Sequence, residues 1–227
     1  MAHHLKIGLA CAALVTAFGA FAQKAGDNIV SVGTAVINSD ASLGPLTNST
    51  VYTSTLAGTT AKVSRETAVS VGLLHLFTDN AGVELTMGVP PRVTQDLNSP
   101  TLGSYPAAKI DVWTPAVVAK YFFGSAQDKW RPYAGLGVSR VSFRNISADS
   151  NATAQLLGGT SANMTSSWAP VYNAGLIYNL DDKWSINGSV SYLPVTTTAT
   201  SVGAAGTTTG DLKLNITDYV IRLGYKF

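Results

Sequence analysis

The stretch that decides the fold is TDYVIRLGYKF, residues 217–227, at the C-terminal end of the chain. Its aromatic residues and two of its aliphatic residues share one parity: Tyr219, Ile221, Leu223, Tyr225 and Phe227. Every charged residue of the stretch lies on the other parity. Successive side chains of a β-strand point to opposite faces, so one face suits lipid and the other suits a polar lumen. The pattern predicts a strand of a transmembrane β-barrel, and an edge strand of a soluble β-sandwich is the alternative.

Seven earlier segments show the same alternation with a period of two residues. In these segments aliphatic and aromatic residues favour one parity, while small, polar or charged residues favour the other. The predicted strands are 29–37, 67–77, 83–92, 111–123, 131–143, 168–178 and 184–195. Together with the C-terminal stretch they predict an all-β fold, an eight-stranded antiparallel transmembrane β-barrel.

The predicted connections alternate in length. Three are short, and they span 78–82, 124–129 and 179–183. Four are long and rich in Ser, Thr, Gly and Asn, and they span roughly 38–66, 93–110, 144–167 and 196–212. Outer-membrane barrels have short periplasmic turns and long extracellular loops. This asymmetry favours the barrel over a sandwich, which has no reason to separate its connections by length.

Aromatic residues on the outward parity gather at two levels. Nearer the short turns lie His75, Phe77, Tyr121, Phe123, Trp130, Tyr178, Trp184, Tyr225 and Phe227. Nearer the long connections lie Trp113, Tyr172, Tyr192 and Tyr219. Aromatic belts at both membrane interfaces are typical of such barrels, although core packing is the plainer explanation for any single ring.

The first 22 residues have the features of a cleavable signal peptide. An apolar run over 7–20 is followed by Ala20-Phe21-Ala22, a small-x-small pattern that predicts cleavage before Gln23. The run is shorter than the roughly 20 apolar residues of a spanning helix, which is one alternative. A lipoprotein signal at Cys11 is the other, and its flanking residues fit poorly. We expect a signal peptide at 1–22 and a barrel at 23–227, located in the cell outer membrane.

Composition narrows the class further. Charged residues make up 12% of the chain, about half of the roughly 25% that is usual in soluble domains. No basic patch or run is present, so nucleic acid is not an expected partner. After the signal segment no apolar run is long enough for a spanning helix. A chain that crosses lipid must satisfy every backbone hydrogen bond internally, either in helices or in a closed barrel. Without a spanning helix, the composition favours a closed barrel.

Several segments resemble the OmpW family of outer-membrane proteins. The matching residues are FTDNAGVEL (77–85), YFFGSAQDKWRPYAGLGV (121–138), SW (167–168), LDDKWSINGSVSY (180–192) and LGYKF (223–227). The resemblance implies an eight-stranded barrel with a narrow, largely hydrophobic interior and a role in passing small apolar solutes across the outer membrane. Ser191 departs from the family pattern, in which a bulky aromatic residue faces the lumen. That departure weakens any transfer of a family gate to this chain.

Two groups of inward-facing residues are the candidate sites. A charge cluster near the short turns consists of Glu84, Lys120, Arg131, Arg222 and Lys226. Higher in the lumen we expect an apolar wall made of Val118, Val141, Phe143, Val171, Ile177, Leu193, Val195 and Val220. The charges form either a floor that restricts ions or a structural network. The apolar wall is either a path for apolar solutes or packing that plugs a small barrel.

The remaining candidates concern chemistry and assembly. His75 is the one histidine after the signal segment, and its outward parity leaves no inward general base for catalysis. We expect no enzyme activity, no cofactor and no metal site. Tyr225 and Phe227 resemble the terminal signal by which barrel-assembly machinery recognises its clients. Outer-membrane lipid, that machinery and small apolar solutes are the expected partners. Pro115, Pro170 and Pro194 lack the N–H of a central strand, and they predict weak points in the wall through which a solute could leave sideways.

Overall fold

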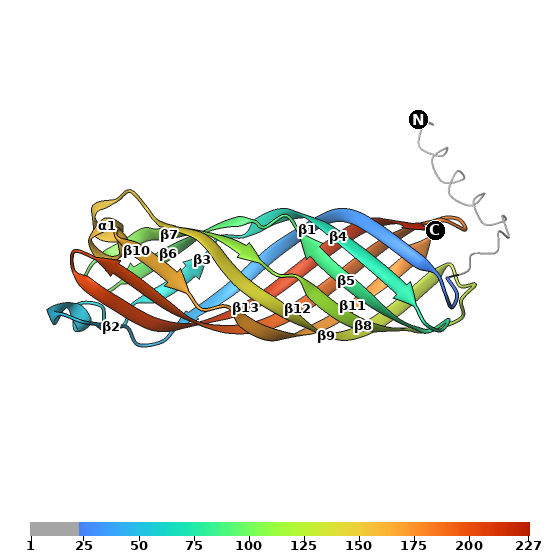
Figure 1. Cartoon of the computed structure of the whole chain (residues 1–227), viewed down its shortest axis with the longest axis horizontal. Coiled ribbons are helices and arrows are strands. Elements are labelled where there is room, and N and C mark those ends of the chain that lie inside the picture. The colour runs from blue at the N-terminus through green and yellow to red at the C-terminus, as the bar shows by residue number, and fades with distance from the viewer. Residues whose placement is uncertain (1–22) are drawn as a thin grey trace, which may run out of the picture.

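The computed structural model describes residues 23–227, an elongated barrel of tilted strands (Figure 1). The predicted signal peptide at 1–22 lies outside the described residues. The elements in chain order are β1 (Asn28–Leu43), β2 (Thr47–Asn48), the 3₁₀ turn η1 (Val51–Thr53), β3 (Thr60–Val63), β4 (Glu66–Leu76), β5 (Ala81–Gly88), β6 (Arg92–Ser99), β7 (Gly103–Trp113), β8 (Ala116–Phe122), β9 (Trp130–Ala148), α1 (Ala152–Gly158), β10 (Ser161–Met164), β11 (Ser167–Asn179), β12 (Trp184–Gly203) and β13 (Gly206–Lys226).

Eight of these strands close into a ring of antiparallel neighbours. The order around the ring is β1, β4, β5, β8, β9, β11, β12 and β13, and β13 pairs again with β1. At the seam Ile29 pairs with Lys226 and Ile37 pairs with Asp218. The predicted eight-stranded barrel is therefore confirmed, because every strand of the ring has a paired neighbour on both sides. In the described part of the chain, 23–227, no helix is long and apolar enough to cross a membrane.

The predicted parity holds in all eight strands. In β9, for example, Leu136 is 66% exposed on the outside, whereas Tyr133 is 2% exposed and Ser139 is buried completely. A shift of one residue in any strand would have exchanged its two faces. The aromatic residues of both predicted belts point outward, and rings such as Trp130 and Tyr178 pack against each other near the short turns.

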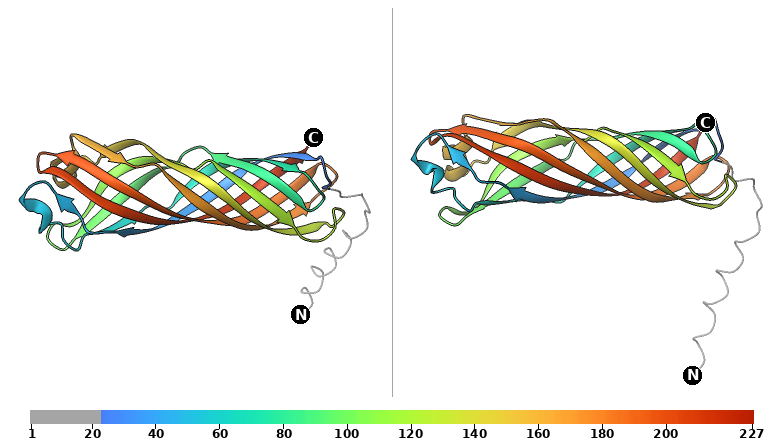
Figure 2. Two further views of the ribbon diagram at one scale, coloured as in Figure 1. Left: turned by 60° about the horizontal axis from the view of Figure 1, so that its bottom comes forward. Right: turned by 90° about the horizontal axis from the view of Figure 1, so that it is seen from below.

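The barrel has two ends and two halves, which we name by their connections. The turn end carries the three short turns and both termini of the described chain, where the Phe227 N–H donates to the Asn28 carbonyl (3.0 Å). The membrane half runs from the turn end to the level of Tyr172, Tyr192 and Tyr219. The outer half lies beyond that level and carries β2, β3, β6, β7, α1 and β10 (Figures 1 and 2).

The four long connections are not loops over most of their length, which corrects the prediction. β1 continues to Leu43 and β9 to Ala148, while β12 and β13 form a hairpin that extends far beyond the membrane half. Between β5 and β8 the chain forms the β6–β7 hairpin, whose second strand pairs with β9. The short helix α1 was also missed. It is capped by the Asn151 side chain, which accepts a hydrogen bond from the Ala154 N–H (2.9 Å).

Candidate functional site

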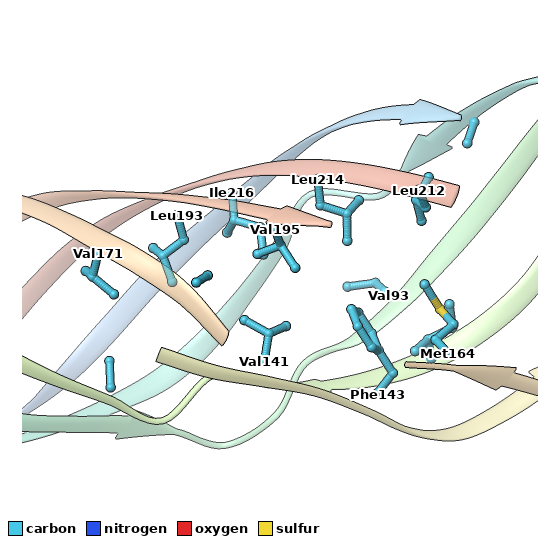
Figure 3. Packing of buried hydrophobic residues seen from close by; sticks show 14 of the residues in the cluster. Val93, Val141, Phe143, Met164, Val171, Leu193, Val195, Leu212, Leu214 and Ile216 are labelled. Carbon is cyan, nitrogen blue, oxygen red and sulfur yellow. The ribbon is translucent and has the colours of Figure 1, made fainter. Parts of the chain in front are cut away.

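The upper lumen is filled by apolar side chains, which we call the upper apolar cluster (Figure 3). Six predicted wall residues belong to it: Val118, Val141, Phe143, Val171, Leu193 and Val195. The cluster also contains residues outside the predicted strands. Ala61, Val93, Ile110, Met164 and Leu212 come from the predicted long connections, and Leu214 and Ile216 come from the short unassigned stretch before the C-terminal strand. The alternation of Leu212, Leu214 and Ile216 with Asp211, Lys213 and Asn215 was the signal that could have found them.

Two predicted wall residues lie elsewhere. Ile177 is buried at the turn end, in a lower apolar cluster with Ile29, Leu74, Leu76, Phe122 and Tyr133. Its place there follows from the β9–β11 register, in which Ile177 pairs with Arg131, close to a short turn. Val220 is half-buried and lines a cavity below the upper apolar cluster. The lumen is thus layered, with a polar layer between two apolar clusters.

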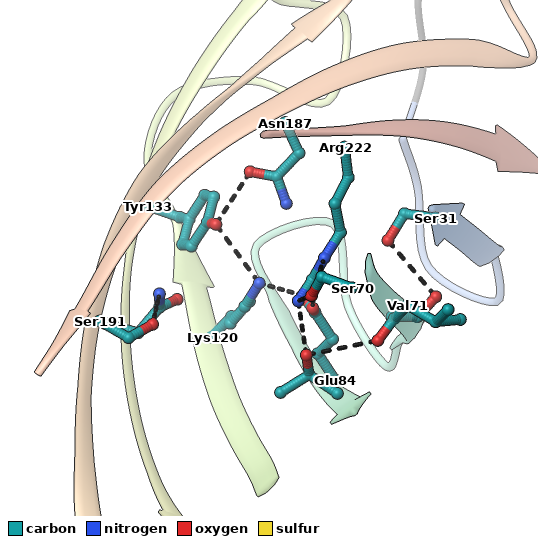
Figure 4. A network of polar contacts seen from close by, with 12 residues as sticks. Ser31, Ser70, Val71, Glu84, Lys120, Tyr133, Asn187, Ser191 and Arg222 are labelled. Carbon is teal, nitrogen blue, oxygen red and sulfur yellow. Dashed lines mark hydrogen bonds and ion pairs between the residues drawn. The ribbon is translucent and has the colours of Figure 1, made fainter. Parts of the chain in front are cut away.

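The polar layer is built on Glu84, Lys120 and Arg222, which we call the charged trio (Figure 4). The Lys120 Nζ and the Arg222 Nη1 donate to the two carboxylate oxygens of Glu84, and all three side chains are at most 6% exposed. Arg222 also donates to the Ser70 hydroxyl (2.7 Å). Two cations on one anion leave a net positive charge, and removal of Glu84 would leave both buried cations without their carboxylate partner.

The other two predicted members of the charge cluster are not part of this network. Arg131 is buried completely at the turn end, where its guanidinium donates to the backbone carbonyl of Gln23 (3.0 Å) and lies 5.2 Å over the Phe122 ring. Lys226 is 3.5 Å from Asp27 near the rim of that end. The single predicted cluster is therefore wrong for these two residues, because a shared inward parity does not place residues at the same height in the barrel.

The wall is interrupted beside the charged trio. The pairing of β4 with β5 ends where the Val89 N–H donates to the Val69 carbonyl (3.0 Å). It resumes where the Ser64 N–H donates to the Thr94 carbonyl (2.9 Å), next to the pairing of β3 with β6. On the other side, the pairing of β5 with β8 stops at Thr86 and Ala116 and resumes where the Val112 N–H donates to the Pro91 carbonyl (3.1 Å), next to the pairing of β6 with β7. Val89, Pro90 and Pro91 cross the interruption, which we call the wall gap. The two prolines lack the N–H that a ladder needs.

The three predicted weak points lie at interruptions of the ladder as well. Pro115 separates β7 from β8 and borders the wall gap. Pro170 and Pro194 lie just beyond Tyr172 and Tyr192, where the pairing of β11 with β12 stops. Pro90 and Pro91 were missed because the aliphatic alternation of β5 continues through Val89 and hides the break in the predicted strand 83–92.

Three cavities follow one another through the lumen. An outer cavity of about 100 Å³ lies under α1 and is lined by apolar residues such as Leu97 and Leu157. A middle cavity of about 30 Å³ shares Ile110 and Met164 with it. A lower cavity of about 70 Å³ shares Pro91 with the middle one and reaches the charged trio. Its lining also includes the outward-facing residues Val69, Met87 and Val89, so the lower cavity extends into the wall gap.

A row of polar residues crosses the lumen wall at the lower cavity. Asp218 on β13 pairs with Ser191 on β12, and Ser191 pairs with Asn173 on β11. The Asn173 amide donates to the Ser191 hydroxyl (2.9 Å). Ser191 thus faces the lumen, as predicted. Its side chain is small, and all three residues of the row line the lower cavity.

The remaining predicted residues lie at the turn end. The His75 ring is 2.9 Å from the Asn28 side chain and packs edge-on against Phe77, outside the lumen. Within residues 23–227 no group of three His, Cys, Asp or Glu side chains is arranged to hold a metal ion. Tyr225 packs against Trp184, and Phe227 is 68% exposed. Their role as an assembly signal stays a prediction.

Comparison with known proteins agrees with this architecture. The OmpW family profile matches residues 24–227. Outer membrane protein W of Vibrio cholerae is 31% identical over 221 residues, which cover 97% of each chain. Outer membrane protein W of Escherichia coli K12 is 26% identical and is covered over 99% of its length. The crystal structure of OprG from Pseudomonas aeruginosa superposes with a TM-score of 0.81 at 28% identity, covering 90% of this chain and 97% of that one.

The matches span the barrel from β1 to the C-terminal residue of β13 and include its closing seam. The named relatives are outer-membrane proteins, which places this chain in the outer membrane. With the family profile matched over nearly all of the described residues, the chain belongs to the OmpW family.

Proposed function

We propose that this protein is a channel through which small hydrophobic molecules pass from the cell exterior into the outer membrane. The observation that carries the proposal is the series of cavities that leads from the outer half to the wall gap. Apolar side chains line most of this series, and a polar pore for water-soluble solutes would have been lined differently. The family resemblance implies the same role.

The exit of the solute is proposed to be sideways, through the wall gap. Val69, Met87 and Val89 border the gap on the lipid side and are each at least 46% exposed. A hydrophobic solute that reaches the lower cavity is therefore close to lipid. Straight passage to the turn end would instead require the solute to separate Glu84 from its two cations, and those charges would lose partners without gaining water.

The small volume of the middle cavity restricts the solute. Phe143, Leu214 and Ile216 line this cavity, so a solute passes only when such side chains change rotamer. Rotamer changes of aliphatic side chains are fast compared with strand separation. We therefore expect slim, flexible molecules to pass more readily than rigid, bulky ones.

The second candidate function is that of a plugged barrel that acts through its outer half. The tight packing of the upper apolar cluster favours it, since Val141 and Leu212 are at most 1% exposed. An eight-stranded barrel has an interior just wide enough for side chains to fill. In that case the apolar interior would serve stability alone, and no solute would cross.

Uptake of radiolabelled n-octane separates the two functions. Cells with an intact outer membrane would carry the wild-type chain, the chain with Ala68→Phe, or no copy. Ala68 lines the lower cavity beside the wall gap, so the phenyl group should slow uptake. Ala119→Phe on the lipid-facing side of β8 is the matched control and should leave uptake unchanged. Heat-dependent migration on a detergent gel would check that every variant folds. Equal uptake with and without the protein would leave the plugged barrel as the function.

A further inference from the structure

The polar row Asp218, Ser191 and Asn173 contains two oxygen atoms that the fold does not satisfy. The Asp218 Oδ1 and the Asn173 Oδ1 are both shielded from solvent, and neither has a hydrogen-bond partner within the described chain, 23–227. Most buried polar atoms in proteins are hydrogen-bonded, so each exception calls for a reason. Here both exceptions are acceptors, and both belong to a row that borders the lower cavity.

The amide and guanidinium donors beside the two free acceptors are already engaged. The Asn173 amide donates to the Val190 carbonyl (3.1 Å) and to the Ser191 hydroxyl (2.9 Å). The Arg222 guanidinium donates to Glu84, Ser70 and Thr86. A donor for the two free acceptors can therefore come from a molecule in the cavity without breaking a bond of the charged trio.

The surrounding charges select a neutral donor. The charged trio has one more cation than anions, and the Asp218 carboxylate, which lines the same cavity, balances that charge. An ammonium group would add a positive charge to a balanced site, and an anion would face the Asp218 carboxylate. Uncompensated charge is costly in such an enclosed site. A hydroxyl group supplies one hydrogen-bond donor and no charge, so it fits the site.

The space above the row suits an apolar tail. Asp218 lines the middle cavity as well as the lower one, and there its neighbours include Ile37, Val112 and Ile216. A molecule whose head group reaches Asp218 can place its hydrocarbon chain among these side chains. The polar row thus lies where the apolar series of cavities first meets polar groups.

We propose that the Asp218–Ser191–Asn173 row binds the hydroxyl group of small neutral amphiphiles, such as medium-chain alcohols, while their hydrocarbon chains lie in the apolar lumen. The inference rests on the proposed function, because the alcohol must first enter the lumen. It adds that the channel prefers hydroxylated molecules over plain hydrocarbons of similar length.

The test measures binding to the full barrel in lipid nanodiscs, corrected for partitioning into empty nanodiscs. The probes are n-octane, 1-octanol and 1-methoxyheptane, an ether with the formula of 1-octanol but without a donor. Hydrogen bonds to a charged acceptor support a preference of roughly tenfold for 1-octanol over the ether. The side-chain amide resonance of Asn173 should also shift on addition of 1-octanol.

Asp218→Val should remove the preference for 1-octanol while leaving the binding of n-octane. Asp211→Val is the matched control, because Asp211 lies on the outer face of the same strand. If the valine variant does not fold, Asp218→Asn should reduce the preference without abolishing it. Octane binding with equal affinities for alcohol and ether would overturn this inference and leave the channel intact. Tighter binding of octylammonium than of 1-octanol would also overturn it, and absence of binding by every probe would overturn both proposals.

Discussion

Four strands, β1, β9, β12 and β13, run through both the membrane half and the outer half of the barrel, and their apolar side chains face opposite sides in the two halves. In β13, Ile221 points outward and is 59% exposed in the membrane half, whereas Leu212 points inward and is 1% exposed in the outer half. The charges follow the reverse rule, since Arg222 faces the lumen and Lys213 faces outward. The inversion takes place between Ile216 and Tyr219.

The physical reason is the medium that surrounds each half. Lipid covers the membrane half, so apolar side chains face outward and polar groups gather in the lumen. Water covers the outer half, so its apolar side chains turn inward and form the upper apolar cluster, as they do in a soluble protein. A strand can change its hydrophobic face in mid-course without a change of register, because each residue responds to the medium at its own height.

The largest difference between the halves is expected for their ion pairs. Glu84→Ala in the membrane half should lower the free energy of unfolding by roughly 3–5 kcal/mol, because it leaves two buried cations without their partner. Asp111→Ala in the outer half breaks the partly exposed pair with Arg92 (3.0 Å), and it should cost about 1 kcal/mol or less. Urea titration of the protein folded in lipid vesicles measures both. Similar losses would mean that the charged trio is hydrated.

Truncation of leucines should separate the halves next. Leu214→Ala removes an inward side chain from the upper apolar cluster, and core truncations of this kind cost about 2–5 kcal/mol. Leu223→Ala removes an outward side chain that is 44% exposed, where lipid chains can fill the space, so its cost should be clearly smaller. The same urea titration compares them. A larger loss for Leu223→Ala would contradict the assignment of water to the outer half.

An arginine on the outside should distinguish lipid from water directly. Leu136→Arg in the membrane half should destabilise the folded barrel by about 2–4 kcal/mol if residue 136 lies near the bilayer midplane. Ser161→Arg, at an exposed position of β10 in the outer half, is the control and should change the free energy of unfolding by less than about 0.5 kcal/mol. Folding yields in vesicles of graded urea content provide the measurement. A well-tolerated arginine at position 136 would place β9 at a different height in the membrane.

The smallest expected effect concerns the helix of the outer half. Asn151→Ala removes the side-chain cap of α1, and loss of such a cap costs about 1 kcal/mol. Because α1 lies over the outer cavity, the loss should appear as faster hydrogen exchange of the α1 amides, with β1 and β13 unchanged. Equal acceleration in the strands would mean that α1 supports the whole outer half.

The sequence predicted the membrane half in detail because lipid imposes one simple rule on every strand. Alternation with apolar residues outward identified all eight strands, their faces and their order, and the resemblance to the OmpW family agreed with them. The same rule failed for Leu212, Leu214 and Ile216, because their alternation has the opposite sign and the surrounding Thr and Gly residues resemble a loop. To assign the inward face of these three residues correctly, one must know how far each residue lies from the membrane.

Parity alone also could not assemble the candidate site. Glu84, Lys120 and Arg222 meet because the tilt and stagger of their strands bring distant residues to one level, while Arg131 and Lys226 share their parity at another level. Pro90 and Pro91 were hidden inside an aliphatic strand pattern. The free oxygens of Asp218 and Asn173 have no signature in the sequence, since their lack of partners depends on three neighbouring strands.

The seam between β1 and β13 has a consequence for the order of folding. It joins residues that are about 200 positions apart in the chain, and such distant contacts form slowly because closure of the ring must precede their stabilisation. Until β13 pairs with them, β1 and β12 each present an edge of unpaired backbone N–H and C=O groups. Lipid offers no hydrogen-bond partners to these groups. Intermediates in which β13 is not yet paired are therefore unstable in the bilayer, and the strand that closes the ring decides whether the other seven remain inserted.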